Sequence, residues 1–91
     1  MFKYQSETDK EYSIKGDQWL FKFDNNHGAS VIRNMLSYGH EQGLFELAVI
    51  WWEDEDNWHL DYTTPITDDV LGHLDLHDVN ILLDEIKKLD K

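Results

Sequence analysis

The side chains best suited to acid–base chemistry in this chain are two carboxylates and an imidazole in neighbouring segments. Glu46 lies in an apolar run, while His59 and Asp61 alternate with apolar residues just after an acidic turn. Neighbouring strands bring two such acids within ~5–9 Å of each other, the range that glycoside hydrolysis uses. One hypothesis is therefore a small hydrolase or a metal-binding protein that uses Glu46, Asp61 and His59.

Other observations favour a protein that is not an enzyme. Two carboxylates are easily found among the 19 acidic residues of the chain. The sequence contains no nucleophile elbow around a serine and no phosphate-binding glycine loop ahead of a helix. A buried carboxylate without a partner is unfavourable, so we expect Glu46 to face water or to accept a hydrogen bond. We therefore expect no catalytic residues and treat the hydrolase as the alternative.

A second group of candidate ligands lies at alternate positions near the C-terminus. His73, Asp75 and His77 are residue types that bind zinc and related ions, but a structural site needs about four converging ligands. Cysteine is absent, which excludes thiolate ligands and disulfides. The acidic run at residues 53–57 lacks the alternating oxygen ligands, the glycine and the distal glutamate of a calcium-binding EF-hand loop. We therefore expect neither a bound metal nor another cofactor.

The net charge of −11 is unevenly distributed along the chain. No Lys or Arg occurs between residues 34 and 86, whereas acidic residues occur throughout this stretch. Such a field repels phosphates, so we expect neither nucleic acid nor an anionic membrane to bind directly, whereas a basic protein of host or virus would be attracted. In one form of this hypothesis the carboxylates mimic the phosphates of nucleic acid on a basic groove. The simpler interpretation is that the charge keeps an aromatic-rich protein soluble.

The positions expected to contact a basic partner lie in the acidic turn and at a second acidic pair. Trp52, which lies just before the turn, is also predicted to bind the partner, because aromatic residues are enriched at interfaces. The predicted partner-binding residues are Trp52, Glu53, Asp54, Glu55, Asp56, Asp68 and Asp69.

Residues 44–52, which precede the acidic turn, form the segment that must position these side chains. Successive side chains of a strand point to opposite faces, and here both sets are apolar: Phe45, Leu47, Val49 and Trp51 on one face, Leu44, Ala48, Ile50 and Trp52 on the other. A strand of this kind lies inside a sheet and is covered on both faces. Residues 58–62 alternate between apolar and polar, which predicts a half-buried returning strand.

Alternation also predicts two earlier strands, at residues 19–23 and 29–33, joined by a turn at residues 24–28. Tyr12 and Ile14 suit a short edge strand ahead of them. A further reversal is expected at residues 38–43, which contain two glycines. Together these elements form an antiparallel meander.

The clearest helical spacing lies at the C-terminus. Asp75 suits an N-cap, and apolar residues recur at intervals of three and four from Leu76 to Leu89. A second, short helix is expected from Thr67 to a stop at Gly72. The long helix would cover one face of the sheet. The other face would be covered by the N-terminal arm, residues 1–11, or by a second copy of the chain in a homodimer.

The fold predicted from these elements is α+β, an antiparallel β-meander of three to five strands packed against one C-terminal amphipathic helix. We expect a single domain of residues 1–91, in which residues 1–11 form a flexible arm. No apolar run approaches the ~20 residues that span a bilayer. The N-terminus lacks the apolar segment of a signal peptide, so we expect a cytoplasmic protein.

Several blocks of the sequence resemble a group of small phage and prophage proteins. The blocks are FDN with GASV (residues 23–31), ELAV (residues 46–49) and DYTTPITDDVLG (residues 61–72), compared with NGYGASV, ELAV and YDTPITDDVIG in that group. The similarity covers residues 19–89 and departs where Asn26-His27 replaces a glycine-aromatic pair and Thr63 replaces an aspartate. The group has no established biochemical activity. The resemblance therefore implies a phage or prophage accessory protein in the host cell and leaves its mechanism open.

Overall fold

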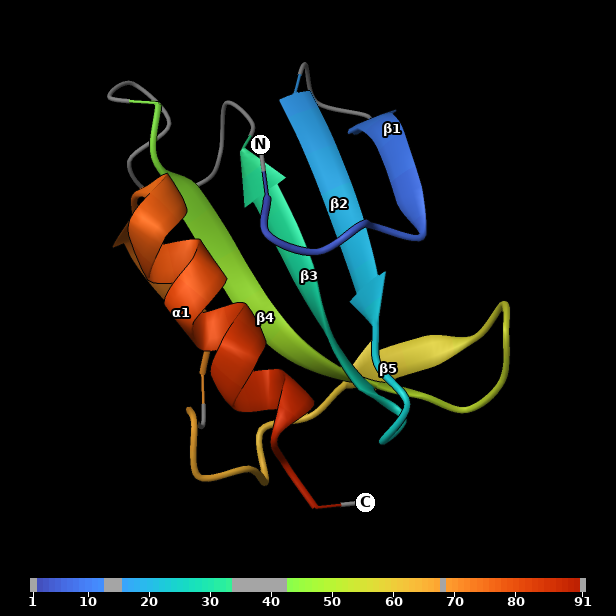
Figure 1. Cartoon of the computed structure of the whole chain (residues 1–91). Coiled ribbons are helices and arrows are strands. Elements are labelled where there is room, and N and C mark those ends of the chain that lie inside the picture. The colour runs from blue at the N-terminus through green and yellow to red at the C-terminus, as the bar shows by residue number, and fades with distance from the viewer. Residues whose placement is uncertain (1, 13–15, 34–42, 68, 91) are drawn as a thin grey trace.

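The computed structural model describes residues 2–12, 16–33, 43–67 and 69–90 (Figure 1). In chain order its elements are β1 (Thr8–Tyr12), β2 (Gly16–Lys22), β3 (His27–Arg33), β4 (Phe45–Trp52), β5 (Trp58–Leu60), β6 (Leu71–Leu74) and α1 (Leu76–Lys87). All strand pairs are antiparallel, and the order in the sheet is β1-β2-β3-β4-β5. The short β6 pairs with the start of β4 on the same edge as β5. The predicted α+β meander with one C-terminal helix is confirmed.

Strand β4 lies inside the sheet and is covered on both faces, as its two apolar sets predict. On one face, Phe45, Leu47 and Val49 pack against α1, whose contribution to the core is Val79, Leu83 and Ile86. On the opposite face, Ile50 and Trp52 form a smaller cluster with Leu20, and Trp58 packs against it. We call the face toward α1 the helix face and the opposite one the outer face.

The N-terminal arm covers the helix face rather than the outer face, so the prediction for its placement is wrong. The ring of Phe2 makes edge contacts with Trp19, Phe21 and Phe45, with centroids 5.1 to 5.4 Å apart. Figure 1 shows this segment crossing in front of β2 and β3, beside α1. Residues of the predicted flexible arm also form β1, which pairs with β2.

Polar contacts fix the arm to α1. The Lys3 amide donates to Asn80 Oδ1 at 2.8 Å, and Lys3 Nζ lies 2.7 Å from Asp84 Oδ2. The Tyr4 hydroxyl donates to the other carboxylate oxygen of Asp84. The bonds from Lys3 and Tyr4 lower the pKa of Asp84, which therefore stays ionised as their shared acceptor. Lys3 and Tyr4 of the predicted flexible arm are thus bound to α1 in this structure.

The outer face is covered at one end by the β4–β5 hairpin. Although β5 pairs with the edge of β4 that lies away from β3, it extends in Figure 1 across the lower ends of β3 and β2. This bend brings Trp58 onto the cluster of Leu20, Ile50 and Trp52. The outer face is thus covered in part by a folded-back hairpin of the same chain. Ile50 and Trp52 are buried within the single chain, and the homodimer stays a prediction.

The indole of Trp52 lies on the outer face and reaches a backbone acceptor of β2. Its Nε1 donates to the carbonyl oxygen of Phe21 at 2.9 Å, over the position of Gly28. A Cβ at Gly28 would lie 1.9 Å from that oxygen and 2.7 Å from Nε1, so only glycine fits there. Trp52 is 3% exposed and does not offer a surface to a partner. Its predicted role as a partner-binding residue is therefore wrong.

The C-terminal helix follows its sequence signals. Asp75 is the N-cap, and a capping box forms because Asp78 N donates to Asp75 Oδ1 at 2.8 Å while Asp75 N donates to Asp78 Oδ2 at 3.2 Å. At the other end, Asn25 Nδ2 donates to the carbonyls of Ile86 and Lys87 in the last turn and of Leu89 just after it, at 2.8 to 3.2 Å. The β2–β3 turn therefore satisfies carbonyls that α1 leaves free.

The predicted short helix from Thr67 to Gly72 is wrong, because this segment leads into β6. The Thr67 hydroxyl accepts from Asp69 N at 3.0 Å, which holds a local turn, and Leu71 and Leu74 then pair with β4. Asp68 lies outside the described residues, as do Ile14 of the predicted edge strand and residues 38–42 of the predicted reversal. Within the described part of the chain, no helix has the length and apolar character of a membrane span.

Candidate protein-interaction site

The acidic turn between β4 and β5 is a fixed structure with its carboxylates outside. Glu53, Asp54, Glu55 and Asp56 are all exposed. Asp54 Oδ1 accepts from the backbone amides of Asp56 and Asn57, both at 2.9 Å, and Asn57 Nδ2 donates to both carboxylate oxygens of Asp54 at 3.0 Å. These bonds, the one from the Asn57 side chain first, lower the pKa of Asp54. The hydrogen bonds of Asp54 therefore hold the turn in a set shape, with its carboxylates outside.

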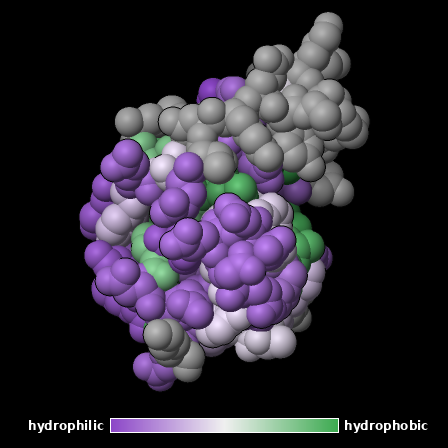
Figure 2. Space-filling view, turned by 90° about the vertical axis from the view of Figure 1, so that its right-hand side faces the viewer, coloured by the Kyte–Doolittle hydropathy of each residue, from purple (hydrophilic) through white to green (hydrophobic). Residues whose placement is uncertain are grey.

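Few positive charges lie near this turn. His59 Nδ1 lies 3.1 Å from Glu53 Oε1, and both side chains are more than half exposed. Lys22 lies over the ring of Trp52 at 5.7 Å from its centroid and also helps to lower the pKa of Asp54. Among the described residues, Glu55 and Asp56 form no salt bridge. Figure 2 views the side of the molecule with β1 and the acidic turn, and most of the surface drawn there in colour is hydrophilic.

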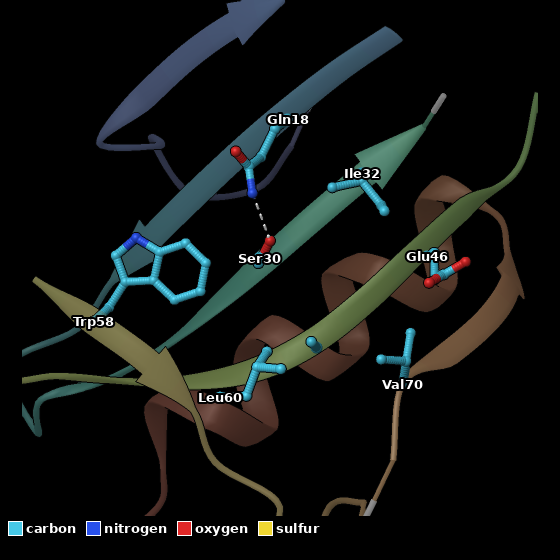
Figure 3. A pocket seen from close by; sticks show the side chains of 8 residues that line it. Gln18, Ser30, Ile32, Glu46, Trp58, Leu60 and Val70 are labelled. Carbon is cyan, nitrogen blue, oxygen red and sulfur yellow. Dashed lines mark hydrogen bonds between the residues drawn. The ribbon is translucent and has the colours of Figure 1, made fainter. Parts of the chain in front are cut away.

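Next to the turn, the outer face of the sheet contains a hollow of about 250 Å³. Its floor includes Ala48 and a buried polar pair, in which Gln18 Nε2 donates to Ser30 Oγ at 3.0 Å. Figure 3 looks onto this face with α1 behind the sheet and shows the remaining lining side chains arranged around the floor: Ile32, Glu46, Trp58, Leu60 and Val70. We call this the outer hollow.

A second hollow of about 420 Å³ lies where β3 begins, near the C-terminus, and contains a histidine–carboxylate pair. His27 Nε2 lies 3.0 Å from the carbonyl oxygen of Asp90 and donates to it, because a carbonyl only accepts. His27 Nδ1 faces Asp61 Oδ2 at 3.8 Å and has no hydrogen-bond partner among the described residues. Hydrogen bonds from Thr63, and to a smaller extent the charge of His27, lower the pKa of Asp61.

This histidine was not singled out by the sequence. Its contacts with Asp61 and Asp90 join parts of the chain that are far apart, so no local spacing marks it. The His27 ring is 7% exposed and stands edge-on to Trp51, with centroids 5.0 Å apart. Because its nitrogens are turned inward, the arrangement fastens the C-terminal segment to the start of β3.

The three residues of the hydrolase or metal hypothesis do not converge. Glu46 is on the outer face, where it lines the outer hollow. His59 is paired with Trp51, so it points to the helix face, and Asp61 contacts His27 on that same side. Asp75 is occupied as a helix cap. Within the described residues, no three His, Asp or Glu side chains gather as potential metal ligands.

Of the predicted partner-binding residues, those of the acidic turn and Asp69 are exposed. Trp52 is buried, and Asp68 lies outside the described residues. The tryptophan that lines the outer hollow is instead Trp58, at the start of β5. Its signal in the sequence is the alternation of residues 58–62, which predicts one half-buried side.

Comparison of the chain with family models, curated proteins and solved structures finds no match. The blocks that resemble phage and prophage proteins fall on β3, on β4 and on the connection from β5 to β6. Function is therefore inferred from the geometry and charge of the site.

Proposed function

We propose that this protein is a non-enzymatic, acidic interaction module that binds a basic protein through the acidic turn. The observation that carries the proposal is the run of four exposed carboxylates, Glu53 to Asp56, on a turn held in shape by Asp54. Because the turn is already ordered, little conformational entropy is lost when a partner binds. Glu55 and Asp56 are available to a basic partner without breaking a described salt bridge.

The charge favours a protein partner over nucleic acid or an anionic membrane. A chain with a net charge of −11 repels phosphates, whereas complementary charge accelerates association with a basic surface. Exposed ion pairs contribute only about 0–1 kcal/mol each, so the acidic turn alone supplies attraction and orientation rather than high affinity. A partner of useful affinity must also contact neighbouring surface.

The setting we propose is that of a phage or prophage accessory protein in the cytoplasm of the host cell. Support comes from the sequence blocks FDN with GASV, ELAV and DYTTPITDDVLG, which include structurally important positions such as Asn25 and Gly28. In one form of the proposal, the carboxylates occupy a groove that normally holds nucleic acid. The protein would then act as an inhibitor of a basic host or viral protein.

The test uses a short peptide rich in lysine and arginine, titrated by calorimetry at several salt concentrations. We expect binding at low salt that weakens as salt rises, since the Debye length falls to about 3 Å at about 1 M. The triple variant Glu53→Gln, Glu55→Gln, Asp56→Asn should lose most of this binding. Its matched control is Glu7→Gln, Asp24→Asn, Glu85→Gln, which removes three exposed acids that are not part of the acidic turn.

Equal loss in the two triple variants would indicate an effect of net charge alone and would contradict a localised site. Binding that is unchanged at about 1 M salt would contradict the electrostatic mechanism. The hypothesis of nucleic-acid mimicry is tested in a separate assay, in which the protein competes with a fluorescent DNA duplex for a lysine-rich histone. Displacement by the wild type but not by the acidic-turn variant is the expected result.

A further inference from the structure

The outer hollow is space on the sheet that the described chain does not fill. Strands β2, β3, β4 and β5 and the residue before β6 all contribute to its lining (Figure 3). Its volume of about 250 Å³ exceeds the ~150 Å³ in which an apolar cavity already accommodates benzene. It is smaller than the ~300–1,000 Å³ typical of pockets for drug-sized ligands. The space suits one large side chain.

The chemistry of the lining favours an apolar guest. Five side chains of the lining contribute hydrocarbon surface: Ile32, Ala48, Trp58, Leu60 and Val70. Leu60 is 47% exposed, so a guest that covered it would remove further apolar area from water. The polar floor pair is already hydrogen-bonded to itself, Gln18 to Ser30. An apolar guest therefore does not break that bond.

The borders of the outer hollow are acidic. Trp58 follows the acidic turn directly, and Val70 follows the exposed Asp69. Glu46 lies within the lining, and no Lys or Arg side chain is among the described residues that line it. A guest side chain is therefore best presented by a segment with positive charge on both sides of it.

We propose that the outer hollow binds a single large apolar side chain, such as leucine, methionine or phenylalanine, from a basic segment of the partner protein. This inference rests on the proposed function and adds the feature by which one basic partner is distinguished from another. The acidic turn attracts basic segments in general. The hollow selects those that contain an apolar side chain between the charges.

The test compares two synthetic peptides of equal length and charge, one with a leucine flanked by lysines and the other with a serine at that position. We expect the leucine peptide to bind about tenfold more tightly to the wild-type protein, the gain that burial of one aliphatic side chain supplies. Affinities are measured by calorimetry. Methyl signals of Ile32, Leu60 and Val70 in NMR spectra should move with the leucine peptide and much less with the serine peptide.

Two pocket variants serve as probes, and one charge variant is the control. Ala48→Leu fills the floor, and Leu60→Thr removes a wall at an exposed strand position where folding is not at risk. Each pocket variant should bind the leucine peptide and the serine peptide with equal affinity. Glu55→Gln should weaken both peptides by the same factor and preserve their ratio. Circular dichroism confirms that each variant is folded.

The outcomes separate this inference from the proposed function. Equal affinity of the wild type for the two peptides, with normal salt dependence, would overturn the hollow as an anchor site and leave the acidic module standing. A preference for leucine that persists in Ala48→Leu and Leu60→Thr would also overturn it. If neither peptide binds in a salt-dependent manner, the result would contradict both the proposed acidic module and the proposed anchor site.

Discussion

The two faces of β4 are both largely apolar in sequence, apart from Glu46 on the outer face, and they are covered in different ways. Along the centre of the helix face, α1 and Phe2 of the arm cover β4, with Leu47, Val49 and Leu83 fully buried. The outer face is covered at one end by the bent β4–β5 hairpin, while its other end retains the outer hollow over Ala48. An amphipathic helix presents a continuous stripe to a sheet, whereas a three-residue strand such as β5 spans only part of it. The uncovered part of the outer face, the outer hollow, is therefore available as a binding surface.

The largest effect is expected from Gly28→Ala, which tests whether the covered end of the outer face is as tightly packed as the helix face. The added Cβ would overlap the Phe21 carbonyl and displace the Trp52 indole. We expect destabilisation of more than about 4 kcal/mol or loss of folding. Urea denaturation followed by tryptophan fluorescence measures it. A change below about 1 kcal/mol would show that this end of the outer face is loosely packed.

Leucine truncations compare the two faces directly. Leu83→Ala on the helix face should lower the free energy of unfolding by about 3 kcal/mol, because it leaves a cavity in a closed core. Leu60→Ala at the rim of the outer hollow should change it by less than about 0.5 kcal/mol, because Leu60 is largely exposed. Chemical denaturation of both variants provides the values. Similar losses would remove the distinction between a sealed and an open face.

Trp52→Phe separates the hydrogen bond of the indole from its bulk. The variant leaves the Phe21 carbonyl without its buried donor. An unsatisfied buried acceptor costs about 1–3 kcal/mol, so a loss in this range is expected, with the peptide affinities unchanged. The same denaturation and calorimetry experiments apply. Altered peptide binding in a stably folded Trp52→Phe would restore Trp52 as a contact residue.

The smallest effect is expected for the dependence of stability on low pH, through Asp61 beside His27 at the end of the helix face. Hydrogen bonds from Thr63 lower the pKa of Asp61 below its ordinary value in the folded protein. The resulting stability is present above the unfolded pKa of about 3.9 and is lost as pH falls through the folded pKa. Asp61→Asn should therefore be less stable near neutral pH and show a flatter loss of stability below about pH 4. Urea midpoints at several pH values measure the slope.

The control for that experiment is Glu55→Gln, which removes an exposed carboxylate of the acidic turn. Its stability should follow the wild type at every pH. If Asp61→Asn does the same, the hydrogen bonds between Asp61 and Thr63 do not contribute to acid sensitivity.

Local patterns in the sequence were sufficient to predict the main elements. Alternation indicates β2, β3 and β4, and the cap at Asp75 with its helical spacing indicates α1. The acidic turn was likewise evident as a charged run between two apolar segments. These features depend on near neighbours in the chain, which is why composition and period identify them.

The features that were missed depend on distant contacts. The docking of Phe2 on the helix face, the pairing of β6 with β4, and the contact of His27 with Asp61 each join remote segments. Alternation placed Trp52 on the outer face correctly but could not show that the hairpin bends back over it. The same bend determines that Trp58, rather than Trp52, lines the outer hollow.

The pairing of β4 has a further consequence for self-association. β5 and β6 occupy the two ends of one edge of β4, and Asp61 N donates to Val49 O between them at 2.9 Å. Along the described residues, the free edges on that side belong to β5 and β6, which have only three and four residues, and short edge strands offer few backbone groups to another strand. On the opposite border lies β1, whose sequence TDKEY alternates opposite charges, and charged edge strands resist unwanted pairing. Growth of the sheet by addition of strands is thus disfavoured on one border by short edge strands and on the other by the charged sequence of β1.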